Sequence, residues 1–161
     1  MSSKSKTASA DFGYLKRYDL SDLPERKFTF YDIEGEPTLT VVPATSANKG
    51  YWSGVMERSA KRKRSESQLR RLAAGKVGAD FIAEQQANAK ALLPEHCIKG
   101  WEGVLNSQGK DVPFSTENAA LFIEALPDWI YGILYTFITN PRSFVGDAEP
   151  DEDDIAGLAK N

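Results

Sequence analysis

The sequence predicts an α+β fold in which helices predominate around a single core. β-rich segments at residues 28–31 and 38–42 flank a break that contains Gly and Pro, which indicates an N-terminal β-hairpin. Residues 100–114 show a second strand-turn-strand pattern, so a second small hairpin is expected. Apolar residues elsewhere recur at helical spacing. About four helices are therefore expected to share one core with the two hairpins.

A length of 161 residues is most simply explained by one domain with two tails. Residues 1–24 open on Ser, Lys, Thr and Ala without an apolar run and are expected to form a mobile leader. Residues 25–145 carry the aromatic and aliphatic side chains of a single globular domain. Residues 146–161 hold six acids against Lys160, which predicts a disordered acidic tail.

The first expected helix begins near Ala47, with Ser46 as its N-cap. Gly50 and Gly54 weaken this helix, because glycine loses more backbone entropy than other residues. Its apolar face is expected to consist of Tyr51, Trp52, Val55, Met56 and Ser59.

A second helix is expected to start at Ala79, and Pro94 should end it or begin the next turn. Ser115 is expected to cap a helix over residues 116–126, and a last helix over 128–139 follows. The apolar stripe of the helix from Ala79 is Phe81, Ile82, Ala89, Leu92 and Leu93.

The last helix has a wide apolar arc, while Tyr131 and Tyr135 stand one turn apart on another side. One interpretation is a central helix whose two tyrosines are only partly buried. The other is a face for self-association or for a partner helix, since aromatic residues are enriched in interface cores. Tyr131 and Tyr135 are therefore candidate partner-binding residues. The arc expected in the core is Trp129, Ile130, Ile133, Leu134 and Phe137.

A basic segment spans residues 58–71, with seven basic residues and one acidic residue. Three interpretations remain open: a solvated helix face, a contact for an acidic protein or for the chain's own tail, and a nucleic-acid contact. Nucleic acid is the least favoured partner, because dedicated binders are usually basic throughout and this chain has a pI near 5.3. Arg62, Lys63 and Arg64 are the candidate binding residues here.

Catalytic and metal-binding motifs are not recognisable in the sequence. His96 and Cys97 are adjacent, and neighbouring side chains usually point apart, which is unsuitable for a base and its nucleophile. The acidic tail lacks the Gly at the sixth position and the Glu at the twelfth position of an EF-hand loop. Gly75-Lys76 lacks the preceding Gly and the following Ser or Thr of a phosphate-binding loop. The expectation is a non-catalytic protein without cofactor or metal.

Cellular context is indicated by a single cysteine and by the N-terminal composition. One Cys allows no internal disulfide, and the leader has no secretory apolar region, so a reducing cytoplasm is expected. The longest dense apolar run, residues 129–138, is about half of what a membrane-spanning helix requires. No membrane association is expected.

The segment around the second hairpin resembles the tail assembly chaperones of long-tailed bacteriophages. The likeness covers roughly residues 92–144. It rests on a Trp-x-Gly motif, a glycine turn and a Val-Pro-Phe-Ser run followed by an acid and Asn, at Trp101, Gly103, Gly109, residues 112–115, Glu117 and Asn118.

This resemblance implies a non-enzymatic chaperone in the host cytoplasm that binds the tape-measure protein and the tail-tube protein during tail morphogenesis. Self-association is possible for such a protein. The alternatives are a permanent structural protein of the virion tail, a small host adaptor protein, and a nucleic-acid-binding module that uses residues 58–71.

Overall fold

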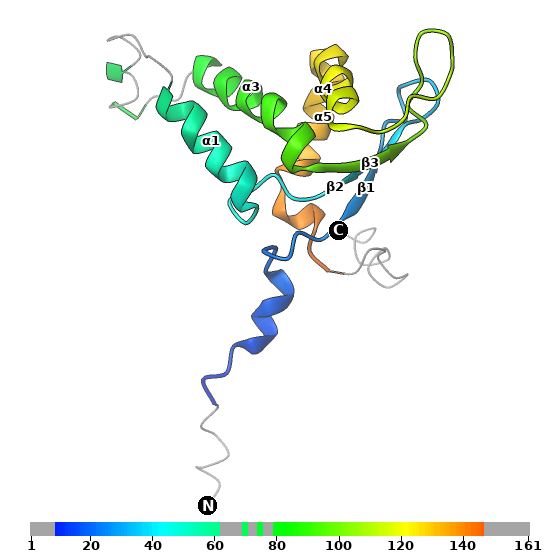
Figure 1. Ribbon diagram of the computed structural model, residues 1–161. Coiled ribbons are helices and arrows are strands. Elements are labelled where there is room, and N and C mark those ends of the chain that lie inside the picture. Colours follow the sequence, from blue (N-terminus) through cyan, green and yellow to red (C-terminus); the bar gives the residue numbers. More distant parts are fainter. Residues whose placement is uncertain (1–8, 62–68, 71–73, 76–78, 147–161) are drawn as a thin grey trace, which may run out of the picture.

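The computed structural model describes residues 9–61, 69–70, 74–75 and 79–146. The expected fold class is confirmed: α-helices predominate and pack beside a small antiparallel sheet (Figure 1). The elements follow the order η2 (Gly13–Tyr18), β1 (Arg26–Thr29), β2 (Thr38–Val41), α1 (Lys49–Lys61), α3 (Ala79–His96), β3 (Ile98–Glu102), α4 (Thr116–Ala125), α5 (Asp128–Ile138) and η3 (Pro141–Ser143).

The sheet has the order β1-β2-β3, and both pairs are antiparallel. β1 and β2 form the expected N-terminal hairpin, in which Phe28 lies opposite Leu39. Leu39 in turn lies opposite Trp101 of β3, so the three side chains share one face. That face is the one on which the core is built, since Leu39 is fully buried.

The second hairpin differs from the expectation. β3 pairs with β2, and the chain beyond the turn contributes only one isolated bridge, between Leu105 and Asp111. A two-stranded hairpin is only marginally stable alone. β3 instead forms backbone hydrogen bonds along the free edge of β2, which gives a three-stranded sheet. The returning chain is still held, because the indole Nε1 of Trp101 donates to the carbonyl of Val112 at 2.9 Å.

Helices α4 and α5 cover the core face of the sheet through aromatic rings. Phe122 of α4 packs edge-on against both Phe30, at 5.7 Å between ring centroids, and Trp101, at 5.6 Å. Phe137 of α5 lies 5.1 Å from Phe28. Edge-to-face pairs of this kind add to the burial of area. The cap expected at Ser115 is confirmed, because its hydroxyl accepts from the Asn118 amide.

Helices α1 and α3 pack closely because α1 carries glycines where α3 presents side chains. A Cβ on Gly54 would lie 2.6 Å from a methyl carbon of Leu92, and one on Gly50 would lie 2.9 Å from Nδ1 of His96. The two glycines have low helix propensity, but the absence of their side chains leaves a groove on α1 into which α3 packs. Pro94 does not end α3, which continues to His96. Pro94 lacks the amide that would bond to the carbonyl of residue 90, and α3 continues for only two residues beyond it.

The N-cap of α1 is Asn48, and the expectation of Ser46 is wrong. The Asn48 side-chain oxygen accepts from the Tyr51 amide at 3.2 Å. Its nitrogen donates to the carbonyls of Pro43, at 3.0 Å, and His96, at 2.9 Å. Both the oxygen and the nitrogen of this buried side-chain amide are hydrogen-bonded, so Asn48 fixes the start of the helix more firmly than an exposed serine would.

The N-terminal segment contains a 3-10 helix, η2, none of whose residues is buried. Figure 1 shows it extending away from the body of the molecule. Leu20 is the first residue along the described chain that is buried in the core. The boundary at residue 24 stays a prediction, and the acidic tail from residue 147 lies outside the described residues.

Candidate partner-binding site

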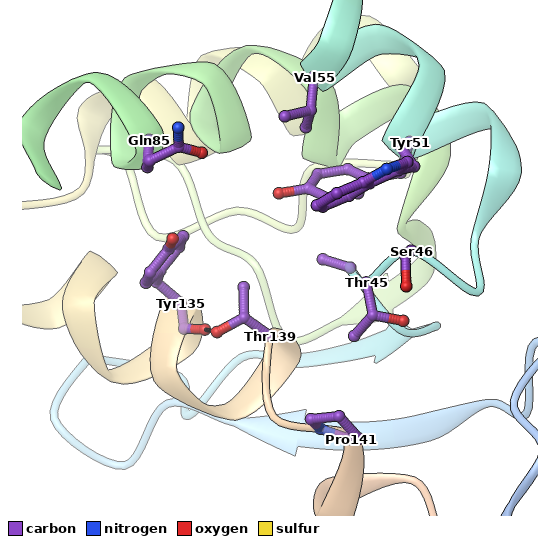
Figure 2. Close-up of a pocket in the computed structure, with 10 residues that line it drawn as sticks. Thr45, Ser46, Tyr51, Val55, Gln85, Tyr135, Thr139 and Pro141 are labelled. Carbon is purple, nitrogen blue, oxygen red and sulfur yellow. Dashed lines mark hydrogen bonds between the residues drawn. The ribbon is translucent and has the colours of Figure 1, made fainter. Parts of the chain in front are cut away.

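A cleft of about 290 Å³ opens between α1, α5 and the loop that precedes α1. Figure 2 shows side chains from these elements and from α3 turned toward a common space. The amide of Ala44 donates to the Ile138 carbonyl at 2.9 Å and so holds the loop against the end of α5. The cleft is lined by Ala44, Thr45, Ser46, Tyr51, Trp52, Val55, Gln85, Tyr135, Thr139 and Pro141.

None of these lining residues carries a charged side chain. Burial raises the pKa of the Tyr51 phenol, and the neighbouring Cys97 and Tyr135 add to the shift. Burial also raises the pKa of Tyr135. Both hydroxyls therefore stay neutral and can donate or accept hydrogen bonds. The cleft suits an uncharged occupant with apolar and hydrogen-bonding groups, because an unpaired charge is costly to desolvate.

Tyr131 lies inside the core, so the expectation that it stands outside the core is wrong. Its side chain is 4% exposed, and its hydroxyl donates to the Gln86 carbonyl of α3 at 3.1 Å. Burial raises the pKa of this phenol. The bond to α3 removes the penalty of burying the hydroxyl. Tyr135 is half-buried and lines the cleft, where a partner can still reach it.

The face of α5 opposite Tyr131 is the exposed one. Trp129 and Ile133, which were expected in the core arc, are 63% and 46% exposed. The buried positions are Ile130, Tyr131, Leu134 and Ile138. Both sets have helical spacing, so periodicity alone does not distinguish them. The buried face packs into the core, and its Tyr131 also bonds to the Gln86 carbonyl of α3, a contact that no local pattern reveals.

The candidate residues Arg62, Lys63 and Arg64 lie outside the described residues. Two basic side chains at the start of the same segment have intramolecular contacts. The guanidinium of Arg58 donates from Nε to Asn88 Oδ1 at 3.2 Å, and Lys61 pairs with Glu57 at 2.7 Å. These contacts join α1 to α3 and stabilise the C-terminal turns of α1.

Cys97 is fully buried, and burial raises the pKa of its thiol to about 12. Its sulfur lies 3.7 Å from the Asn48 nitrogen, whereas His96 Nε2 lies 3.7 Å from a carboxylate oxygen of Glu95. The thiol is protonated at neutral pH and is a packing residue. Across the described ranges, no group of three His, Cys, Asp or Glu side chains is placed to hold a metal ion.

Of the helices in the described part of the chain, none combines the length and the apolar character needed to cross a bilayer.

Comparison with known proteins identifies the chain as phage-derived. Residues 52–138 match the family of YdaY prophage proteins, and since the match covers more than half of the chain, the protein belongs to that family. No curated protein and no solved structure matches the chain. The matched region runs from Trp52 to the end of α5, so it includes Trp52, Val55, Gln85 and Tyr135 of the cleft.

Sequence reasoning missed most of the cleft. Trp52 and Val55 were expected on one apolar face, and that stripe was the available signal. Gln85 comes from α3, whereas Thr139 and Pro141 follow the end of α5, and the two places share no motif. Only the packing of α5 beside α1 brings them together.

Proposed function

We propose that this prophage protein is a tail assembly chaperone. It binds the tape-measure protein and the tail-tube protein in the host cytoplasm, masks their apolar surfaces until assembly, and catalyses no reaction. Two findings support the proposal. The family is of phage origin, and the segment that resembles tail assembly chaperones lies largely within the matched residues 52–138.

The observation that carries the proposal is the uncharged cleft with an apolar strip beside it. Trp52 and Met56 are one helical turn apart on α1 and are 41% and 56% exposed. Trp52 lines the cleft, and Met56 continues the same side of α1. An uncharged groove flanked by an apolar strip can accept an amphipathic helix, which docks through residues spaced three and four apart. Methionine adapts its shape to different partners.

The test is co-expression with the tape-measure protein of the same prophage. The wild-type chain is expected to raise the soluble fraction of the tape-measure protein and to co-purify with it. Met56→Ser and Trp52→Ser remove anchors of the strip, and loss of an anchor typically costs about 2 kcal/mol, or roughly 30-fold in Kd. Melting temperatures of both variants show whether folding is retained.

Tyr31→Ser is the matched control, because Tyr31 is 77% exposed in the β1–β2 turn and belongs to neither the cleft nor the strip. It should bind as the wild type does. Failure of the wild-type chain to solubilise or bind the tape-measure protein would contradict the proposal.

A permanent tail protein is distinguished by mass spectrometry of purified phage particles. The chaperone leaves before the particle is complete, so the chain should be absent from them. Its presence at a fixed ratio to the tail-tube protein would favour the structural alternative.

A further inference from the structure

The N-terminal arm, residues 11–18, and the outer stripe of α5, centred on Trp129 and Ile133, are two exposed apolar surfaces of the same chain. The four large apolar side chains of the arm are Phe12, Tyr14, Leu15 and Tyr18, exposed by 64%, 65%, 47% and 46%. Four adjacent side chains of this size are seldom left in water without a partner.

The arm is ordered locally and joined firmly to the body. The carboxylate of Asp11 accepts from the Gly13 amide at 2.9 Å, which starts the turn. At the other end, Asp19 accepts from the amide of Ser21 at 2.9 Å, and Leu20 is buried in the core. Figure 1 shows the arm extending away from the body. The arm is therefore presented to another molecule.

The α5 stripe offers a surface of matching size and character. Gly132 lies on the same side as Trp129 and Ile133, and a Cβ there would meet nothing within 4 Å, so no other side chain of the molecule covers the stripe at this position. Thr136 continues the stripe and is exposed.

The charges of the two surfaces are complementary. Lys16 and Arg17 lie in the second half of the arm, and the Arg17 guanidinium stacks 4.8 Å from the centroid of the Tyr18 ring. The segment 116–138, which forms α4 and α5, contains three acids and no basic residue. Two of these acids, Glu124 and Asp128, are exposed and precede Trp129 closely in the chain. Opposite charges of this kind fix the orientation of docking.

We propose that two copies of this chain form a dimer by exchanging their N-terminal arms, each arm docking on the outer α5 stripe of the other copy. The exposed parts of the arm side chains amount to roughly 400 Å². Two reciprocal contacts would bury roughly 1,200–1,600 Å² in total, which is the size of a stable specific interface. A twofold dimer satisfies both arms and both stripes.

Sedimentation equilibrium of the full chain tests the proposal. The wild type is expected to be a dimer at micromolar concentration. Phe12→Ser with Tyr14→Ser removes the arm anchors, Trp129→Ser removes the stripe anchor, and each variant is expected to be monomeric with an unchanged far-UV circular dichroism spectrum, because these side chains are outside the core. Tyr31→Ser, the matched loss of an exposed aromatic residue elsewhere, should stay dimeric.

Mixing the arm variant with the Trp129→Ser variant gives the sharper readout. The arm of one and the stripe of the other are intact, so a heterodimer with one of the two contacts is expected, weaker than the wild type yet absent from either variant alone. Lys16→Glu should weaken the dimer, and Glu124→Lys in the same chain should restore it. A monomeric wild type, a dimer that survives both sets of substitutions, or a mixture that stays monomeric would overturn the proposal.

Discussion

The aromatic residues on the sheet and those of the N-terminal arm have similar side chains and opposite environments. Phe30 is 4% exposed and packs edge-on against Phe122, whereas Phe12 is 64% exposed. The two residues differ in exposure because the elements packed around them differ. β1 is paired with β2, and Phe28 on its core face packs against Phe137 of α5, whereas every residue of the arm is exposed. Aromatic content therefore indicates where burial is possible, and long-range pairing decides where it occurs.

The largest effect that tests this contrast is expected from Trp101→Ala. The indole packs against two phenylalanine rings and donates to Val112, so its loss should lower the free energy of unfolding by about 3 kcal/mol. Phe12→Ala in the arm should change it by less than about 0.5 kcal/mol, as surface substitutions usually do. Urea denaturation measures both, and similar losses for the two variants would contradict the assignment of core and arm.

Alkaline pH should lower the stability of the protein because of its buried tyrosines and its buried cysteine. The pKa values of Tyr51, Tyr131 and Cys97 are raised by burial, that of the thiol from 9.0 to about 12. The native state therefore holds protons that the unfolded state releases. This stability is fully present below about pH 9 and is lost as the pH rises through the raised values.

Melting temperatures recorded between pH 8 and pH 11 should fall by several degrees. Tyr131→Phe should reduce the slope, although it also removes the bond to Gln86. A melting temperature that does not vary over this range would be inconsistent with buried phenols.

Smaller effects are expected at two helical glycines, one at a packed surface and one at an open surface. Gly132→Ala should stabilise the protein by about 0.5–1 kcal/mol, because alanine favours the helix and meets empty space. Gly54→Ala should destabilise it by about 1 kcal/mol, since overpacking against Leu92 outweighs the same helical gain. Thermal denaturation of the two variants measures both effects. Equal gains in stability for Gly132→Ala and Gly54→Ala would show that α1 and α3 are not closely packed.

Local sequence rules predicted the helices well and the surfaces poorly. The cap at Ser115 and the N-terminal hairpin were found because their signals are local. Asn48 was missed as a cap because its side chain is held in place by the carbonyls of Pro43 and His96, which are far apart from each other in the chain. The pairing of β3 with β2 likewise depends on an edge 60 residues away in sequence.

Helix α5 shows the same limit for the candidate site. Its apolar residues occupy most of the helix circumference, so the buried face was decided by packing against other elements, including the bond from Tyr131 to Gln86 of α3. Tyr131 was thereby placed in the core and Trp129 at the surface, the reverse of what periodicity and the usual partial exposure of tyrosine indicate. Tyr135 alone of the two tyrosines lines the cleft.

Hydrogen–deuterium exchange on the complex with the tape-measure protein tests the central claim most directly. If the uncharged cleft and the strip on α1 bind that partner, backbone amides of residues 45–56 and 135–141 should gain protection, and those of the β1–β2 turn should not. Protection confined to the turn or to α4, with residues 45–56 exchanging as in the free protein, would contradict the account.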